Sequence, residues 1–355
     1  MKRLSDHVAS SVLTSIIGVL LILVGVDILS ALYNEADELG ERYSFMNALF
    51  YVAMTIPSRI YEFIPYSSLV GCLVGLGSLA GNSELVVMRA AGVSLLRIVW
   101  FVMKPVLVII VFGIGLAEYL VPHSEQSANT YKALRQGSGQ VRSSDSDLWV
   151  KEGNEYIHIN AVAPGNALYG VARYRFDDDR QLQEASFSER VTFKNSYWEE
   201  ENVSITRFAE EHSSTEVDSE LVRRWDTELS PNVLRLSSLP IQSLSIGGLH
   251  EYANYLQQQG QDAAPYWLGF WSKSLQPISV LSLVLVAISF IFGPLRQVTM
   301  GFRIFTGVIL GLAFNISQEM LGPSSLVYGF SPVIAVLIPV SICALIGLLL
   351  LRRAA

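Results

Sequence analysis

The sequence predicts a bundle of six transmembrane helices with an all-β extracytoplasmic domain inserted between the third and fourth spans. Of its 355 residues, 51% are hydrophobic and only 16% are charged, and the mean hydropathy is +0.38; soluble domains carry about 25% charged residues. Residues 123–265 contain 22 acidic and 13 basic residues, against 10 and 12 in the remainder. This composition excludes a disordered chain or a fibre, and the absence of a basic stripe argues against nucleic-acid binding.

Six apolar segments have the length needed to cross a hydrocarbon core, which takes about 20 helical residues. Residues 45–80 are too many for one crossing and contain Pro57 and Pro65, so we expect an approach helix followed by a crossing at 58–80. The chain then divides into spans one to three (1–122), the exported domain (123–265) and spans four to six (266–355). The other expected crossings are residues 8–33, 98–121, 268–292, 304–320 and 332–351.

Basic residues orient the bundle, because Lys and Arg accumulate in cytoplasmic loops. Both termini are therefore expected in the cytoplasm, and the acidic loop 34–42, residues 123–265 and the turn 322–331 on the opposite side. The first span is too long for a cleaved signal peptide and lacks a small-residue cleavage site after it. The pairs that mark the cytoplasmic side are Lys2 and Arg3, Arg89 and Arg97, Arg296 and Arg303, and Arg352 and Arg353.

Residues 145–236 alternate between apolar and polar positions, with turn-forming clusters between the runs. This pattern indicates five or more antiparallel strands, in a sandwich, a jelly roll or an open barrel. The acidic residues 177–179 fit a solvated hairpin turn better than a calcium loop, since no distal Glu follows. Residues 245–259 have helical spacing behind a serine cap, and we expect this helix to dock on the head of span four.

Signatures of catalysis are missing from the sequence. It contains no GxxxxGK[ST] phosphate loop, so any ATP must be bound by a partner chain. The five histidines lie outside the spans without metal-ligand spacing, and no GxSxG elbow occurs. We therefore expect neither an enzyme nor a resident cofactor or metal.

Seven ionisable residues fall at membrane depth, where a charge is costly and becomes a functional candidate. Arg59 and Lys273 lie in the outer halves of their spans, and Lys132 and Arg135 follow span three on the same side. Together these four cations are candidates to meet the phosphates of a lipid; pairing inside the bundle, such as Arg59 with Glu62, is the open alternative. Lys104, Glu118 and Glu319 lie near the ends of their spans, so their side chains can reach water and need no functional role to be tolerated. The seven residues are Asp27, Arg59, Glu62, Lys104, Glu118, Lys273 and Glu319.

The cytoplasmic stretch 82–92 predicts a short helix, capped by Asn82 or Ser83 and ended by Gly92. We expect it to insert into a groove on a soluble partner; a helix that only lies on the bilayer is the alternative. The residues expected to face the partner are Ser83, Glu84, Leu85, Val86, Met88 and Arg89.

Five segments carry a resemblance to a known family that runs in order along the whole chain. They are similar to the LptF/LptG family, the permease subunits of the lipopolysaccharide-export ABC transporter of Gram-negative bacteria. The segments are SELVVM (83–88), GLHEYANYL (248–256), WSKSLQP (271–277), SFIFGPLR (289–296) and GPSSLVYG (322–329).

The resemblance implies a six-span inner-membrane subunit that pairs with LptF and carries a periplasmic β-jellyroll. An LptB dimer would bind ATP and magnesium and drive the coupling helix at 82–92, and LptC and LptA would receive the lipopolysaccharide. The implied cavity opens to the outer leaflet among membrane lipids, with apolar walls from spans one and five. A sensor that relays force remains a second hypothesis, since it explains the topology but not the cations at membrane depth. The residues assigned to the substrate are Arg59, Lys132, Arg135, Lys273 and Phe314.

Two departures from the family pattern affect the first span and the end of the third. Asn129 stands where relatives can carry Arg, and Glu35, Asp37 and Glu38 stand where relatives can carry lysines. The first span is therefore not assigned direct contacts to lipid phosphates.

Overall fold

A computed structural model describes residues 2–40, 43–135, 148–163, 167–194, 196–208, 214–237, 239–293 and 298–354. The chain separates into two compact units, each described by itself. The helical unit comprises Met1–Asn129, Ile241–Leu249 and Ala264–Ala355, and the β unit comprises Thr130–Pro240 and His250–Ala263.

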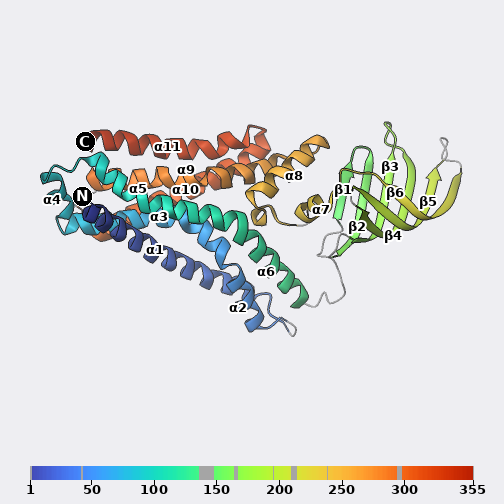
Figure 1. The fold of residues 1–355 in the computed structure, drawn as a ribbon, viewed down its shortest axis with the longest axis horizontal. Helices are drawn as coiled ribbons and strands as arrows, with labels where there is room; N and C mark the ends of the chain where they lie inside the picture. The colour runs from blue at the N-terminus through green and yellow to red at the C-terminus, as the bar shows by residue number, and fades with distance from the viewer. Residues whose placement is uncertain are drawn as a thin grey trace. The chain divides into compact units, whose positions relative to one another are not determined.

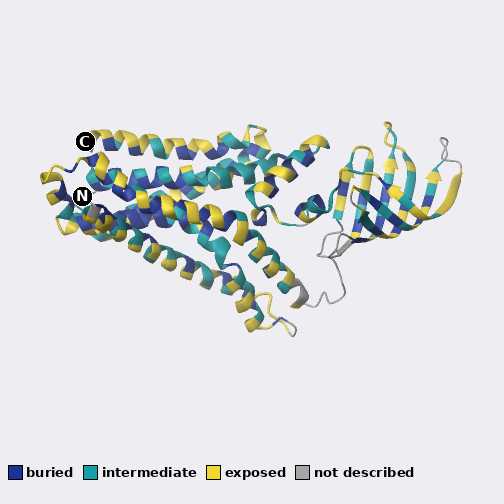
Figure 2. Cartoon of the chain, in the orientation of Figure 1, coloured by how far each residue is buried: buried dark blue, intermediate teal, exposed yellow. Residues whose placement is uncertain are grey.

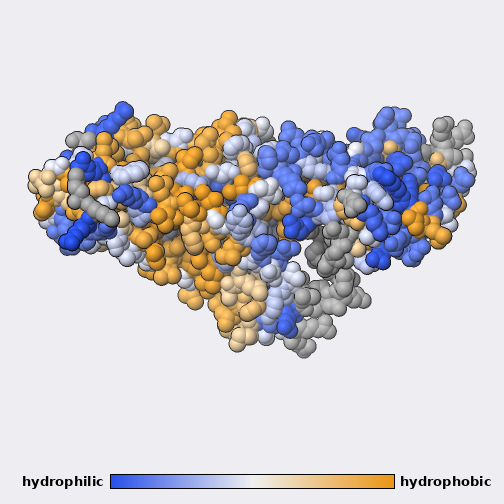
Figure 3. All heavy atoms as spheres, viewed as in Figure 1, coloured by the Kyte–Doolittle hydropathy of each residue, from blue (hydrophilic) through white to orange (hydrophobic). Residues whose placement is uncertain are grey.

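Six helices in the described residues are long and apolar enough to cross a membrane, which confirms the expected number of spans. Figure 3 shows apolar side chains covering the visible face of these helices. The third crossing, α5, continues through a π-helical turn, η1, into α6. The bounds are α1 (Lys2–Ala36), α3 (Ile56–Gly81), α5 (Leu95–Gly115), η1 (Leu116–Leu120), α6 (Val121–Arg135), α9 (Ala264–Phe292), α10 (Met300–Tyr328) and α11 (Pro332–Ala354) (Figure 1).

Prolines were expected near two helix boundaries, and the structure has a boundary near Pro57 but none at Pro323. An approach helix, α2 (Phe45–Met54), ends at Thr55, and Pro57 lies in the first turn of α3, where a missing N–H costs nothing. In contrast, α10 runs through Pro323 and ends only at Gly329, whose φ of 70° terminates it. The turn expected at 322–331 is therefore mostly helix.

Close packing of α1 against α3 defines the core of the helical unit. Gly71 and Gly75 of α3 face Ile16 and Val12 of α1, and a Cβ atom at Gly71 would lie only 2.5 Å from the Cα of Ile16. Small residues at these positions let the two helix backbones approach closely. The same core cluster includes Leu73 of α3 together with residues of α5, α9, α10 and α11.

Among its described residues, the β unit forms a six-stranded antiparallel sheet whose strand order follows the chain from β1 to β6. This confirms an antiparallel all-β domain and gives it the order of a meander. Figure 2 shows buried positions interspersed with exposed ones along the strands. The strands are β1 (Leu148–Glu152), β2 (Glu155–Ala163), β3 (Ala167–Phe176), β4 (Leu182–Lys194), β5 (Tyr197–Phe208) and β6 (Thr215–Trp225).

Left-handed residues interrupt the alternation of buried side chains in two strands. Gly170 has φ 62° and Asn202 has φ 53°, and buried positions lie three residues apart across each of them: Leu168 and Val171, then Glu200 and Val203. At 177–179 the chain forms the expected turn, in which the Asp177 carboxylate accepts a 2.7 Å hydrogen bond from the Gln181 amide.

The chain continues through α7 (Pro231–Ser237), η2 (Ile241–Ser243) and α8 (Ile246–Gln258). Ser245 accepts a 3.0 Å hydrogen bond from the Gly248 amide, as expected for a serine cap. The start of α8 packs on α9, because a Cβ at Gly269 would lie 3.3 Å from Leu249.

Candidate functional site

The helical unit contains a cavity of about 870 Å³, bounded mainly by α3, α9 and α10. Leu23 of α1 also reaches it, as do Ile241 and Gln242 of η2. Phe314 lies in the lining, on α10, and is itself buried. The exposed surface of the wall is mostly apolar, and the aromatic and aliphatic side chains in it include Tyr61, Phe63, Tyr66, Val70, Leu268, Leu312 and Leu326. Such a wall suits acyl chains better than a polar solute.

Three charged side chains interrupt this apolar lining: Glu62, Lys273 and Glu319. The Lys273 ammonium donates hydrogen bonds of 2.8 Å and 2.6 Å to the carbonyl oxygens of Gln242 and Leu244. An ammonium has three donors, so two of them are already committed to holding η2 against α9. Lys273 therefore has a structural partner that the sequence did not predict.

Arg59 lies beside the lining rather than in it, between Ser58 and Glu62 on α3. Its guanidinium forms an ion pair with Asp27 of α1, and its Nε donates a 3.1 Å hydrogen bond to the Thr55 hydroxyl. The sequence suggested Glu62 as the partner inside the bundle, and the ion pair instead joins two helices. Ser58 adds a second link by donating to Glu125 of α6.

Lys132 and Arg135 lie in the last turn of α6 and belong to the β unit. The Arg135 guanidinium lies 5.5 Å from the centroid of the Tyr131 ring. The described cavity lining contains neither cation, and their contact with a lipid remains a prediction.

Glu118, which lies on η1, has a role that sequence reasoning missed. Its carboxylate accepts hydrogen bonds from the backbone amides of Ile246 (3.0 Å) and Gly247 (3.4 Å), at the N-terminus of α8. A negative charge there is favourable, because the first amides of a helix lack intrahelical partners. Lys104 and Glu319 also have partners: Lys104 donates to Ser5 at 3.1 Å, and Glu319 accepts from Asn315 at 2.9 Å.

The short helix expected at 82–92 is α4 (Glu84–Ala90), which covers fewer residues than expected. Ser83 precedes it with φ 61° and makes no capping hydrogen bond through its side chain, while Gly92, with φ 84°, follows its end. His7 of α1 contacts its first residue, with Nε2 2.8 Å from the Glu84 carboxylate.

One face of α4 differs from the expectation. Leu85 and Met88 are only 4% and 5% exposed, because they pack into the core of this chain rather than outward. The exposed apolar residues are Val86 and Val87, beside the exposed Arg89. A soluble partner would therefore meet the valines and not Leu85 or Met88.

Comparison with known proteins agrees with the resemblance found in the sequence. Residues 6–353 match the family model described as "Lipopolysaccharide export system permease LptF/LptG". The lipopolysaccharide export system permease protein LptG of Escherichia coli K12 is 35% identical over 354 residues, covering 99% of this chain and 98% of that protein. LptG of Haemophilus influenzae is 33% identical over 342 residues, covering 96% and 95%. The chain therefore belongs to the LptF/LptG family and is a multi-pass inner-membrane permease subunit of the lipopolysaccharide export system, a transporter component rather than an enzyme.

Proposed function

We propose that this chain supplies one wall of the cavity that takes lipopolysaccharide from the outer leaflet of the inner membrane. The observation that carries the proposal is the cavity of about 870 Å³, whose wall is largely apolar and whose border carries the Arg59 cation. Acyl chains would contact the side chains around Phe314, and a phosphate would contact Arg59. Lys132 and Arg135 are proposed as further phosphate contacts outside the cavity.

The cost of moving acyl chains constrains the next step. Transfer of each CH₂ group from an apolar environment to water costs about 0.8 kcal/mol, so several acyl chains exposed at once would cost tens of kcal/mol. The lipid must therefore pass directly into another apolar receiver. We propose that LptC and LptA provide that receiver in the periplasm. In the proposed topology, the β unit also lies in the periplasm and both termini of the chain are cytoplasmic.

The source of energy is proposed to be an LptB dimer that binds ATP and magnesium. It would contact α4 through Val86, Val87 and Arg89, with Glu84 at the start of the helix. Movement of α4 would reach the cavity because Leu85 and Met88 belong to the same core cluster as Phe314. LptF is the proposed second permease that closes the cavity.

Native mass spectrometry of the complex, purified in mild detergent, tests this function by reading subunits and bound lipid together. The proposal expects two ATPase chains and two permeases with lipopolysaccharide retained. Arg59→Glu should lower the bound lipid at least several-fold and leave the subunit composition unchanged, since it repels a phosphate without touching α4.

Arg180→Glu, at an exposed position of the turn between β3 and β4, serves as the matched control for adding a negative charge. Normal lipid retention in Arg59→Glu would contradict the residue assignment. A chain isolated without ATPase or lipid would contradict the transport role and favour a sensor.

A further inference from the structure

Asp27 is a carboxylate at membrane depth, and its only described ion pair is with Arg59. The side chains of Asp27 and Arg59 are 30% and 19% exposed, so the pair is neither sealed in the core nor fully solvated. Leaving either charge unpaired at this depth would be costly. The pairing explains why an acidic residue is tolerated in α1. Stability alone does not explain why the Asp27–Arg59 pair lies at this particular position in the bundle.

That place is the border of the cavity. Leu23, one helical turn before Asp27, lies in the lining. On α3, Ser58 and Glu62 on either side of Arg59 lie there as well. The ion pair therefore joins α1 to α3 where both helices meet the cavity wall.

The geometry of Arg59 resembles that of an anion-binding arginine held ready by its neighbours. The buried Thr55 hydroxyl accepts a hydrogen bond from the Arg59 Nε and donates a 2.9 Å hydrogen bond to the Val52 carbonyl. Thr55 therefore holds the Nε side of the guanidinium in place. Asp27 takes Nη1. A guanidinium offers five N–H groups in a plane that fits carboxylate and phosphate oxygens equally well. The Asp27 carboxylate thus occupies a position that a phosphate oxygen could take.

We propose that Asp27 competes with the lipid phosphate for Arg59. The inference rests on the proposed function, because it requires that Arg59 contacts the phosphate. When the cavity is empty, Asp27 holds Arg59. When lipid enters, its phosphate displaces the carboxylate, and when lipid leaves, Asp27 recaptures the guanidinium and favours release.

The competition has a signature opposite to that of a purely structural ion pair. If Asp27 only joined α1 to α3, its neutralisation would loosen the wall and lower lipid retention. If it competes with phosphate, neutralisation leaves Arg59 available and raises retention. The effect must also disappear when Arg59 is absent, because Asp27 and the phosphate then have no cation to compete for.

The test uses the whole transporter complex in nanodiscs of phosphatidylethanolamine supplied with bisphosphorylated lipid A, and measures bound lipid A and its rate of release. Asp27→Asn should raise the retained lipid A about fivefold and slow its release, as expected when a partly exposed charge pair no longer opposes binding. Arg59→Gln should lower retention, and Asp27→Asn added to Arg59→Gln should change it no further. Retention of a dephosphorylated lipid A should be the same in all variants, because it offers no phosphate to Arg59.

The outcomes separate this inference from the proposed function. If Arg59→Gln lowers retention but Asp27→Asn leaves it unchanged or lower, the lipid site stands and the competition is overturned. If Arg59→Gln has no effect, the assignment of Arg59 to the lipid fails first. Asp27→Ser, which also removes the charge, provides a second variant with the same expected increase if the asparagine protein does not assemble.

Discussion

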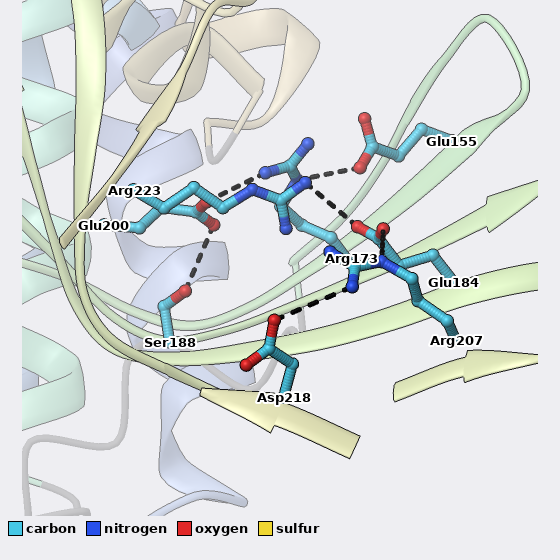
Figure 4. A network of polar contacts seen from close by, with 8 residues as sticks. All are labelled: Glu155, Arg173, Glu184, Ser188, Glu200, Arg207, Asp218 and Arg223. Carbon is cyan, nitrogen blue, oxygen red and sulfur yellow. Dashed lines mark hydrogen bonds and ion pairs between the residues drawn. The ribbon is translucent and has the colours of Figure 1, made fainter. Parts of the chain in front are cut away.

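The two units of the molecule use arginine in opposite ways. In the β unit, Arg173 of β3 is 5% exposed and bonds Glu155 at 2.7 Å and Glu200 at 2.9 Å, with Glu200 completely buried. Ser188 also donates to Glu200 (Figure 4). The Arg173 guanidinium lies 4.6 Å from the centroid of the Trp225 ring. In the helical unit, Arg59 stands at a cavity border with one carboxylate, and both side chains keep some exposure.

The difference separates a charge that fixes structure from one that can be exchanged. Arg173 has partners on β2 and β5, so it ties together strands that are not adjacent in the sheet. Breaking such a pair is strongly destabilising, because the remaining charge stays buried without a compensating partner. Arg59 can give up Asp27 to an incoming anion. The comparison therefore predicts that loss of Arg173 affects folding and loss of Arg59 affects binding.

Removing Arg173 tests the first half of the comparison and has the largest expected effect. Arg173→Met keeps the apolar stem but leaves Glu200 buried without its cation. We expect the β unit to lose about 3–5 kcal/mol of stability. Amide hydrogen exchange of β3 to β5 in the full chain measures the loss, and lipid retention by the remaining folded complex should not change.

Arg190→Met provides the matched control in the neighbouring strand. The Arg190 guanidinium lies 4.0 Å from the Glu201 carboxylate, and both side chains are well exposed. Its loss should cost less than about 1 kcal/mol. Equal losses in the two variants would contradict the view that burial sets the role of Arg173.

Packing, rather than charge, should fix the helical unit. Gly71→Ala places a Cβ 2.5 Å from the Cα of Ile16, so α1 and α3 must separate, and we expect a loss of about 1–3 kcal/mol. Thermal unfolding of the detergent-solubilised complex measures it. Gly18→Ala on α1 is the control, since nothing lies within 4 Å of its added Cβ. A larger loss from Asp27→Asn than from Gly71→Ala would make the ion pair the main structural link between these helices.

The sequence predicted the elements of this protein better than it predicted their contacts. The spans follow from the length of apolar runs, and the serine cap at Ser245 is a local signal within three residues of its partner. The Asp27–Arg59 pair depends on the rotation of two helices about their axes, which hydropathy does not encode. The orientation of α4 was also missed, because a seven-residue helix with apolar residues on several sides gives no clear inward face.

The site shows the same limit. Arg59 and Lys273 were both identified as cations at membrane depth, and the structure gives them different partners: a carboxylate for one and two backbone carbonyls for the other. A backbone partner cannot be recognised from residue type. The sequence identified Asp27 as an ionisable residue at membrane depth. Its partner could be recognised only once the structure placed Arg59 of α3 beside it.

The smallest predicted effect concerns the charge cluster around Glu184, which is less buried than Arg173 and has more charged partners than Arg59. Glu184 of β4 accepts a 3.0 Å hydrogen bond from Arg223 and lies 3.4 Å from Arg207. Burial alone would raise the pKa of Glu184, but the hydrogen bond from Arg223 and the charges of Arg223, Arg175 and Arg207 outweigh it, so the pKa is lowered. These arginines therefore favour the ionised carboxylate in the folded sheet.

A lowered folded-state pKa means that the unfolded chain binds the proton more tightly. The stabilisation is complete above the unfolded pKa, which is about 4.3 for Glu, and is lost as the pH falls through the folded value. Wild-type protein should thus lose more protection in β4 to β6 than Glu184→Gln when the pH falls below about 5, as measured by amide exchange corrected for intrinsic rates. Glu189→Gln, at an exposed position of the same strand, should retain the wild-type pH dependence. If Glu184→Gln retained it as well, the cluster would resemble Arg59 at the cavity border more than Arg173, and partial exposure would be enough to make a charge pair expendable for folding.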